Sequence, residues 1–433
     1  MLPLVTTGLL TDHYELTMVR AALKDGTAQR RTVFEMFARQ LPSGRRYGVV
    51  AGTMRFLDAL ADFRFGADDL AFLRGTGVID EPTAGFLTGY RFSGSIWGYP
   101  EGECYFPGSP ILVVEGTFAE AVVLETLALS VFNHDCAVAS AASRMVNAAA
   151  GRPIIEMGSR RTHEIAAVAA ARAAYIAGFA TTSNLRAGLD YGVPTAGTSA
   201  HAFTLVHDDE REAFCVQLEA LGVDTTLLVD TYDVPTAVRT AVELAGSALG
   251  AVRIDSGDVA EVARGVRAQL DALGAERTRI VVTGDLDEYA IGDLAAAGVP
   301  VDGFGVGTAL VTGSGAPTAA LVYKLVARSA DGGRGLVPVA KRSVGKPTIG
   351  GRKWAARDVG ESGIATAELV SLTPVDENGC QRPLLRQLVR DGEIIVAEPV
   401  EDARQRHQRV LTELPAEARD ITPGGPAIPT KFS

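Results

Sequence analysis

Short apolar runs alternate with longer segments of helical periodicity through the middle of the chain. The runs lie at residues 153–159, 225–230, 251–257, 279–284 and 301–308. Four helical segments follow these runs. The first is RTHEIAAVAAARAAYIAG and the second covers about residues 236–248. The third ends near Leu273 and the fourth near Ala297. Strands that alternate with helices are typical of βα units and a parallel sheet. This number of units predicts a (β/α) barrel, with a doubly wound sheet as the alternative.

The chain before residue 125 mixes helical and strand patterns less regularly. TDHYELTMVRAALKDG predicts a helix that begins at Thr11 or Asp12 and ends at Gly26. Further elements are expected at RTVFEMFAR (a strand), Thr53–Phe63 (a helix) and GECYFPGSPILVVEGT (strands broken by a Gly/Pro turn). We therefore expect an α+β domain at the N-terminus.

These patterns divide the chain into three parts. Residues 1–125 form the α+β domain, and residues 126–330 form a barrel that we expect to carry the functional site. Residues 331–433 are richer in Arg, Pro, Glu and Asp, and we expect them to pack on the N-terminal domain or on the barrel. The final PGGPAIPTKFS is expected to be loose.

Composition and charge exclude several classes of protein. The chain of 433 residues is 47% apolar and 21% charged, which is typical of a globular protein with a large core. Its 41 basic and 52 acidic residues give a net charge of -11, so a nucleic acid partner is not expected. The four cysteines form no CxxC pair, which argues against structural zinc, an iron–sulfur cluster and a disulfide scaffold.

No membrane segment or signal peptide is predicted. The N-terminus lacks a basic segment, and Asp12 interrupts its apolar residues early. The run Gly303–Tyr323 has no charged residue, but its five glycines and its proline indicate buried backbone near a site. We therefore expect a cytoplasmic protein with no membrane partner, and the unpaired cysteines suit a reducing compartment.

Small and polar residues end the predicted strands of the barrel, where sites form in α/β proteins. In RIDSGD, Arg253 can bind a carboxylate through two hydrogen bonds. Asp255 and Asp258 can accept hydrogen bonds from ribose hydroxyls or hold Mg²⁺ through water, while Ser256 and Gly257 shape the turn. The alternative is structural, with Asp258 capping the next helix and Arg253 paired with a neighbouring acid.

Three other groups of residues indicate that an anion binds at these strand ends. Gly305-Val306-Gly307-Thr308 offers backbone N–H groups and a hydroxyl to a phosphate, or is a plain glycine-rich turn. Arg160 and Arg161 stand at a predicted helix N-terminus, where a bound anion would relieve the conflict with the helix dipole. The alternative is an exposed pair with local acids such as Glu164. His201 suits a general base or a phosphoryl acceptor, although a lone histidine is more often structural.

In order along the chain, TDHYELTM, FEMF, EMGSRR, ATTSNLRAG, GVPTAGTSAH, VDTYD, RIDSGD, VTGDLDE and GFGVGT resemble the motifs of nicotinate phosphoribosyltransferases. The resemblance spans roughly residues 10 to 325. It implies an irregular (β/α) barrel of the type II phosphoribosyltransferase kind, with an α+β N-terminal domain that the C-terminal segment rejoins. It also implies formation of nicotinate mononucleotide and pyrophosphate from nicotinate and phosphoribosyl pyrophosphate, in NAD salvage.

The resemblance assigns roles to individual residues. It implies that Tyr14 stacks on the pyridine ring of the neighbouring subunit of a homodimer, and that Thr198 and Arg253 hold nicotinate. It implies that ATP, as a co-substrate, phosphorylates His201, and that Asn184 favours the acid over the amide, because an acid there would repel nicotinate. With His201, Asp255 and Asp258 as catalytic residues, the implied substrate-binding set is Tyr14, Met157, Arg160, Asn184, Thr198, Ser199, Arg253, Ser256, Gly257, Gly284, Gly305, Gly307 and Thr308. Mg²⁺ is expected to bind through pyrophosphate, with Asp255 as a candidate ligand.

The chain departs from the family pattern at a few positions. His13 and Glu15 flank Tyr14 where Leu and Gln are frequent, and Ala202 follows His201 where many relatives have a hydroxyl residue. Because Ala202 has no hydroxyl, it cannot donate the hydrogen bond that this position could offer to a phosphohistidine.

Other readings remain open from the sequence. A nicotinamide phosphoribosyltransferase is disfavoured by Arg253 and Asn184, and a quinolinate enzyme would need more basic residues. A non-catalytic nucleotide-binding barrel would have lost the histidine or an aspartate of RIDSGD, and an aldolase-like barrel would need a lysine at a strand end.

Overall fold

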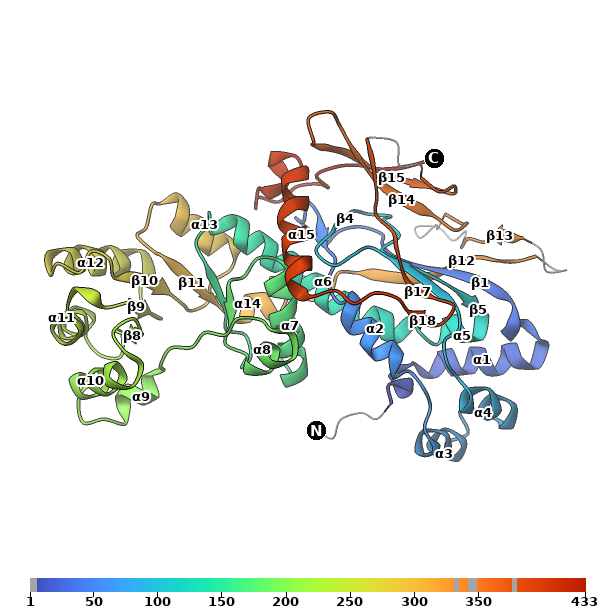
Figure 1. Cartoon of the computed structure of the whole chain (residues 1–433), viewed down its shortest axis with the longest axis horizontal. Coiled ribbons are helices and arrows are strands. Elements are labelled where there is room, and N and C mark those ends of the chain that lie inside the picture. Colours follow the sequence, from blue (N-terminus) through green and yellow to red (C-terminus); the bar gives the residue numbers. More distant parts are fainter. Residues whose placement is uncertain (1–5, 331–334, 342–348, 376–379) are drawn as a thin grey trace. The chain divides into compact units, whose positions relative to one another are not determined.

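The computed structural model describes residues 6–330, 335–341, 349–375 and 380–433. The chain divides into two compact units. The first unit combines Met1–Ala139 with Thr318–Ser433, and the second unit is the intervening Ser140–Pro317. In Figure 1 the first unit holds the blue and red ends of the chain, and the second unit holds its green and yellow middle.

A seven-stranded sheet forms the centre of the first unit, in the order β13-β12-β1-β5-β3-β17-β18. Its strands are β1 (Arg31–Ala38), β3 (Ser95–Gly98), β5 (Leu112–Thr117), β12 (Leu321–Ser329), β13 (Leu336–Pro338), β17 (Arg386–Arg390) and β18 (Glu393–Ile394). The predicted strand RTVFEMFAR is confirmed as β1, which pairs antiparallel with both β5 and β12. Because β13, β17 and β18 belong to this sheet, the C-terminal segment rejoins the N-terminal domain, as the fold prediction required.

Helices pack on this sheet through one apolar core that includes Phe34, Met36, Phe56 and Leu112. They include α1 (His13–Asp25), α2 (Thr53–Ala61), α3 (Ala67–Gly75) and α4 (Glu81–Thr88), and a small hairpin pairs β2 (Gly48–Val49) with β4 (Cys104–Tyr105). The predicted helices at the start of the chain are thus confirmed as α1 and α2.

Local sequence signals set the ends of α1. Asp12 and Glu15 form a capping box at its N-terminus, and Gly26 ends it in the left-handed region at φ 81°. The buried Glu15 carboxylate also accepts hydrogen bonds from the backbone N–H and the hydroxyl of Thr126 (3.0 and 2.6 Å). These bonds fix α1, and therefore Tyr14, to the start of the long helix that contains Thr126.

The helical stretch Phe118–Ala148 has the length and apolar composition to cross a membrane. It consists of α5 (Phe118–Val122) and α6 (Glu125–Ala148). Buried residues make up 67% of its apolar window, and Leu127 and Phe132 lie in the core of the first unit. We therefore interpret it as a core helix. In the part of the chain that the structure describes, no other helix meets the same criteria.

The C-terminal segment forms a second sheet in the order β16-β14-β15-β19. Its strands are β14 (Trp354–Val359), β15 (Ala365–Ser371), β16 (Gln381–Pro383) and β19 (Thr430–Phe432), and α15 (Val400–Glu413) precedes the last of them. The expectation that PGGPAIPTKFS is loose was wrong. β19 pairs parallel with β15, and the backbone N–H of Ala427 donates to the carbonyl of Arg46 (2.8 Å), so main-chain hydrogen bonds hold this end in place.

Buried charged side chains connect this second sheet to the residues around β4. Arg357 on β14 is fully buried and donates to the Glu368 carboxylate (3.0 Å) and to the carbonyl of Cys104 (2.8 Å). Arg382 donates to Glu103 (2.7 Å), whose side chain is also fully buried. Burial raises the pKa of the Glu368 carboxyl. Each of these charges depends on its partners, because an unpaired ion in this interior would be strongly destabilising.

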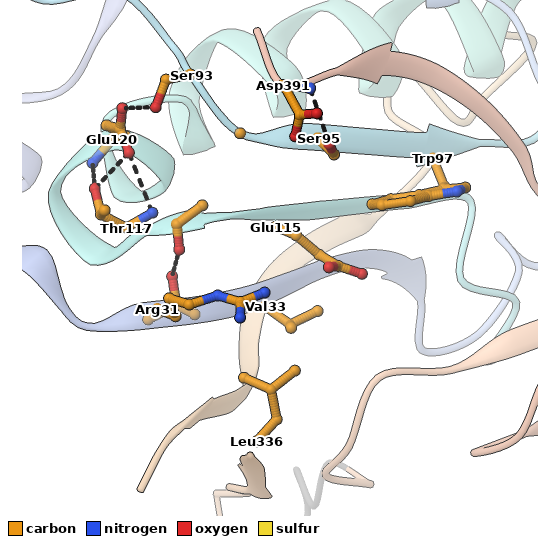
Figure 2. A pocket seen from close by; sticks show the side chains of 13 residues that line it. Arg31, Val33, Ser93, Ser95, Trp97, Glu115, Thr117, Glu120, Leu336 and Asp391 are labelled. Atoms are coloured by element: carbon orange, nitrogen blue, oxygen red, sulfur yellow. Dashed lines mark hydrogen bonds between the residues drawn. The ribbon is translucent and has the colours of Figure 1, made fainter. Parts of the chain in front are cut away.

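An open groove of about 390 Å³ lies over the seven-stranded sheet of the first unit (Figure 2). Its polar groups are largely satisfied by one another and by their neighbours. The hydroxyl of Ser93 donates to Glu120 (2.6 Å), and Glu115 accepts from Arg352 (3.1 Å). Because these contacts account for most of its charged lining, we assign no ligand to this groove.

Six parallel strands form the sheet of the second unit, in the order β7-β6-β11-β10-β9-β8. They are β6 (Ile154–Glu156), β7 (Thr181–Thr182), β8 (Thr226–Leu228), β9 (Ala251–Ile254), β10 (Arg279–Val282) and β11 (Gly303–Val306). The helices are α7 (Glu164–Ile176), α8 (Leu185–Tyr191), α9 (His201–Leu205), α10 (Glu210–Leu221), α11 (Val234–Ala245), α12 (Val259–Ala272), α13 (Glu288–Ala296) and α14 (Thr308–Val311).

The predicted βα units of the second unit are confirmed, and their sheet is a curled half-barrel with β7 and β8 at its edges. The strands are parallel, so all their carboxyl ends lie at one edge of the sheet. The apolar run Gly303–Tyr323 contains β11, α14 and the start of β12, so it is not one helix.

Replacing Arg357 by Ala should lower the free energy of unfolding by about 3–5 kcal/mol, because the buried Glu368 carboxylate loses its partner. Denaturant unfolding monitored by circular dichroism measures the change. Arg74→Ala is the matched control in the same unit, since its ion pair with Glu81 is solvent-exposed and should contribute less than about 1 kcal/mol. Equal effects of the two substitutions would contradict the prediction.

Candidate active site

A cavity of about 300 Å³ opens at the carboxyl ends of the central strands of the second unit. Its lining residues are Met157, Arg160, Arg161, Arg253, Asp255, Thr283, Gly284, Asp285, Gly305, Gly307 and Thr308. They follow β6, β9, β10 and β11, which are neighbours in the sheet. Three arginines face two aspartates in this lining, so the cavity suits an anionic ligand with hydroxyl groups.

Arg253 on β9 is held by the loop before α9. Its Nη1 donates to the hydroxyl of Thr198 (2.5 Å) and to the carbonyl of Ser199 (3.1 Å). Its Nη2 lies 3.6 Å from Asp255, and its buried Nε has no hydrogen-bond partner among the residues that the structure describes. Burial lowers the pKa of Arg253, although the guanidinium stays charged. The anchored guanidinium therefore places a fixed positive charge at the wall of the cavity.

Asp230, at the end of β8, organises the loop after β9. Its Oδ2 accepts hydrogen bonds from the backbone N–H of Asp255 (2.8 Å) and from the hydroxyl of Ser256 (2.7 Å). Its side chain is only 3% exposed, and its buried Oδ1 has no hydrogen-bond partner in the described part of the chain. Thr283 donates to Asp255 from β10. Asp255 is thus held from both sides, its backbone by Asp230 after β8 and its carboxylate by Thr283 after β10.

His201 begins α9 beside these two carboxylates. Its Nε2 lies 3.9 Å from Asp230 Oδ1 and 3.9 Å from Asp255 Oδ2, and its Nδ1 is 3.1 Å from the hydroxyl of Thr231. The side chain is 39% exposed, so a ligand in solution can reach the ring. The two ring nitrogens thus lie beside one hydroxyl and two carboxylates.

The loop after β6 carries the two arginines of EMGSRR. Arg160 and Arg161 are exposed residues of a turn, because α7 begins only at Glu164. The expectation that they stand at the helix N-terminus was therefore wrong, since His163 caps α7 and the preceding residues form a separate turn. Both arginines nevertheless line the cavity.

Glycines let the backbone close the cavity at β11. A Cβ on Gly305 would lie 2.5 Å from the side chain of Thr283 and 2.8 Å from that of Met157. Gly284 adopts φ +123°, a conformation that favours glycine. Thr308 begins α14 directly after Gly307, and both residues line the cavity.

Comparison with known proteins identifies the family of the chain. Residues 9–133 match the family model of the nicotinate phosphoribosyltransferase (NAPRTase) N-terminal domain. The chain is 58% identical to the nicotinate phosphoribosyltransferase pncB1 of Mycobacterium tuberculosis, over 98% of this chain and 95% of that protein. The chain belongs to the nicotinate phosphoribosyltransferase family.

Other relatives agree with this assignment. The nicotinate phosphoribosyltransferase of Bacillus subtilis is 37% identical over 82% of this chain and 74% of that protein. The crystal structure of human nicotinic acid phosphoribosyltransferase matches with a TM-score of 0.83 and 26% identity, over 98% of this chain and 97% of that one. The fold is therefore that of a type II phosphoribosyltransferase, as the sequence resemblance implied.

The structure gathers most of the residues that the family resemblance selected. Those that line the cavity are Met157, Arg160, Arg253, Asp255, Gly284, Gly305, Gly307 and Thr308. Thr198, Ser199 and Ser256 hydrogen-bond to the residues that shape it, and His201 stands beside Asp255.

Other selected residues have structural contacts that do not involve the cavity. Asp258 caps α12 by accepting from the backbone N–H of Glu261 (3.1 Å), and Gly257 adopts φ +84°. Asn184 caps α8 through its Oδ1 and donates from its Nδ2 to the Ser159 hydroxyl (2.9 Å). Tyr14 belongs to α1 of the first unit, where it is 46% exposed, and burial and Glu125 raise its pKa. The functional roles of Tyr14, Asn184 and Asp258, like those of the other selected residues, stay predictions.

Sequence reasoning assigned no individual role to Asp230, Thr283 or Glu156, although all three hydrogen-bond to residues or loops that line the cavity. Asp230 lies in VDTYD and Thr283 in VTGDLDE, both of which carried the family resemblance, but neither residue received a role. Their position directly after an apolar run was a usable signal, because residues at the carboxyl ends of parallel strands share one edge. The described residues contain no group of three or more His, Cys, Asp or Glu side chains that could hold a metal ion.

Glu210, the first residue of α10, has the most perturbed carboxyl group near the His201 loop. Its Oε1 is buried without a hydrogen-bond partner in the described residues. Burial, followed by the charges of Asp233 and Asp230, raises the pKa of Glu210 to about 7. Three carboxyl groups thus lie near one another, and ionising the third costs free energy.

The raised pKa of Glu210 predicts a pH-dependent stability. Between its ordinary value and about 7, the folded state keeps a proton on Glu210 that the unfolded state has released, so this group destabilises the fold increasingly as the pH rises through that window. Glu210→Gln should therefore raise the unfolding midpoint of the protein at pH 8 and leave it nearly unchanged at pH 4. Thermal unfolding at both pH values measures this difference, and an equal shift at both would contradict the assigned pKa.

Proposed function

We propose that this chain transfers the phosphoribosyl group of phosphoribosyl pyrophosphate to nicotinate, in NAD salvage, and couples the transfer to ATP through a phosphohistidine at His201. The observation that carries the proposal is the anchored guanidinium of Arg253 in an arginine-lined cavity, with His201 beside the carboxylate of Asp255. The family of the chain supports the same reaction. The alternative substrate, nicotinamide, has no carboxylate for Arg253 to bind.

Nicotinate recognition rests on Arg253. Thr198 and Ser199 hold its Nη1, which fixes the guanidinium plane at the wall of the cavity where the carboxylate of the substrate is proposed to bind. Two parallel hydrogen bonds between a guanidinium and a carboxylate give both affinity and orientation. In this proposal the pyridine ring stands near Asn184, whose neutral amide does not repel the acid.

The phosphoribosyl group fits the remaining lining. Arg160, Arg161 and the hydroxyl of Thr308 suit its phosphates, and Asp255 suits its ribose hydroxyls. In the reaction, the ring nitrogen of nicotinate bonds to C1 of the ribose while the bond from C1 to pyrophosphate breaks. Positive charge develops on the ribose, and Asp255 is placed to stabilise it. Holding both substrates in line supplies much of the rate enhancement.

Mg²⁺ is proposed to accompany pyrophosphate. The donor set fits this mode, because the cavity offers the Asp255 carboxylate beside arginines but no cage of three acidic or histidine ligands in the described residues. Mg²⁺ bound to pyrophosphate oxygens would neutralise part of the charge that the leaving group carries.

ATP coupling rests on the surroundings of His201. A neutral ring nitrogen bonds to the γ-phosphorus of ATP while the bond to ADP breaks, and water later releases the phosphate. The hydroxyl of Thr231 orients the ring through Nδ1, and Asp230 and Asp255 lie 3.9 Å from Nε2. The added phosphate changes the charge beside Asp255, which links ATP use to binding of phosphoribosyl pyrophosphate.

We further propose that the protein acts as a cytoplasmic homodimer in which Tyr14 reaches the pyridine site of the neighbouring subunit. Exposed apolar residues on α8 and around the end of α9 support a protein contact there, namely Leu185, Leu189, Leu205 and Val206, each at least 61% exposed. Tyr14 itself is 46% exposed. The free thiols of the four cysteines suit a reducing cytoplasm.

Arg253→Lys should raise the KM for nicotinate about 10- to 100-fold, because a lysine cannot form the paired hydrogen bonds of a guanidinium. The KM for phosphoribosyl pyrophosphate should change much less. Initial rates at varied concentrations of each substrate measure both constants. Arg186→Lys alters an exposed arginine of α8 and serves as the control. An unchanged KM for nicotinate in Arg253→Lys would exclude Arg253 as the carboxylate ligand.

His201→Ala should keep a slow ATP-independent formation of nicotinate mononucleotide and lose its stimulation by ATP. The reason is that the substitution removes the nitrogen that accepts the phosphoryl group. Product formation with and without ATP measures this, together with transfer of label from γ-labelled ATP to the protein. His163→Ser is the control, because it changes an exposed histidine and keeps a helix-capping side chain. Full ATP stimulation in His201→Ala would rule out the phosphohistidine.

A further inference from the structure

Glu156 is a buried carboxylate that none of the steps above uses. It ends β6 and is 0% exposed. In the sheet it pairs with Val306 of β11 on one side and with Thr182 of β7 on the other. Glu156 therefore stands where three substrate-facing loops leave the sheet.

Both oxygens of the Glu156 carboxylate accept hydrogen bonds, and they come from different loops. Oε1 accepts the backbone N–H of Gly158, in the loop that carries the cavity arginines, and Oε2 accepts the hydroxyl of Thr182. The oxygen of that hydroxyl accepts the backbone N–H of Asn184 (2.9 Å). The carbonyl of Glu156 accepts the N–H of Ser183 (2.8 Å). One residue thus fixes the loop after β6 and the loop after β7.

A second hydrogen bond, which does not involve Glu156, also joins the β6 loop to the β7 loop. Asn184, in the β7 loop, donates to the hydroxyl of Ser159 in the β6 loop (2.9 Å). The β6 loop also has little room to move, because a Cβ on Gly158 would lie 2.1 Å from the side chain of Val311. The two loops are therefore joined directly by the Asn184–Ser159 hydrogen bond as well as through Glu156.

The chemistry of the contacts explains why a carboxylate stands at this position. Thr182 has one hydroxyl proton and already accepts from Asn184, so its own proton points to Glu156. The N–H of Gly158 is also a donor. The two donors approach different oxygens, so both positions must accept. A carboxylate has two accepting oxygens, whereas a carboxamide would place an N–H₂ group against one of the donors. Burial raises the pKa of Glu156, while the bonds from Thr182 and Gly158 oppose that rise.

We propose that Glu156 is a positioning residue that couples the two substrate-binding loops of this enzyme. The inference rests on the proposed function, in which the β6 loop contacts the phosphoribosyl group and the β7 loop stands beside the pyridine ring. A single change at Glu156 should then weaken both substrates, whereas a change at Thr182 should mainly weaken nicotinate.

Steady-state kinetics test the coupling with three variants. Glu156→Gln places an amide N–H₂ against one of the two donors, so it should raise the KM for nicotinate and the KM for phosphoribosyl pyrophosphate by about 10-fold each, and lower kcat by less. Thr182→Val keeps the side-chain volume without the hydroxyl and should raise mainly the KM for nicotinate. Thr182→Ser restores the hydroxyl and should behave like the unmodified protein. A rise in only one KM in Glu156→Gln, or equal losses in Thr182→Val and Thr182→Ser, would overturn the proposal.

Amide hydrogen exchange tests the same coupling without turnover. Glu156→Gln should speed exchange in residues 158–161 and also in residues 183–187, although only the first segment is adjacent in sequence. Unchanged exchange in residues 183–187 would overturn the proposal even if the kinetics changed. If the unmodified protein forms no product, the proposed function fails, while the exchange comparison still decides whether Glu156 couples the loops. If Glu156→Gln does not fold, the comparison of Thr182→Val with Thr182→Ser decides in its place.

Discussion

All six strands of the second unit run in the same direction, and this constraint determines where its chemistry can lie. Their carboxyl ends meet at one edge of the sheet, so a polar residue after any strand becomes a neighbour of those after the adjacent strands. Arg253, Asp255 and Thr283 meet in this way although β9 and β10 are separated by a whole helix. The glycines after β10 and β11 then allow the backbone to close around the same space.

The charges at this edge are held by groups that come from other strands. Asp230 holds the backbone of Asp255, Thr198 holds Arg253, and Glu156 connects two loops. Hydrogen bonds to ionised groups are stronger than those between neutral groups, and a buried ion that loses its partner is costly. This dependence keeps the side chains in one arrangement before the substrate binds, which is how an enzyme gains rate from orientation. In the first unit, Arg357 and Glu368 stabilise the fold by the same physical chemistry without a cavity beside them.

The sequence predicted the features that depend on neighbouring residues, and it missed those that depend on contacts between distant residues. The caps of α1 and the apolar runs of the βα units depend on residues close in sequence, and they were predictable. The contacts of Asp230 with Asp255 and of Glu156 with Thr182 join residues 25 and 26 positions apart, which no local pattern specifies. The pairing of β19 with β15 spans a still longer separation, so the last residues were wrongly expected to be loose. Asp258 was ambiguous for another reason, because a carboxylate at a helix N-terminus suits capping and catalysis equally.

The central claim is that the anchored guanidinium of Arg253 selects a carboxylate-bearing pyridine and that ATP use at His201 assists its conversion. The most direct measurement is product formation by the unmodified protein from phosphoribosyl pyrophosphate and Mg²⁺, with nicotinate or nicotinamide, each with and without ATP. The account predicts nicotinate mononucleotide as the main product, formed faster with ATP. Equal or faster conversion of nicotinamide would contradict the role of Arg253, and a rate that does not change with ATP would contradict the role of His201.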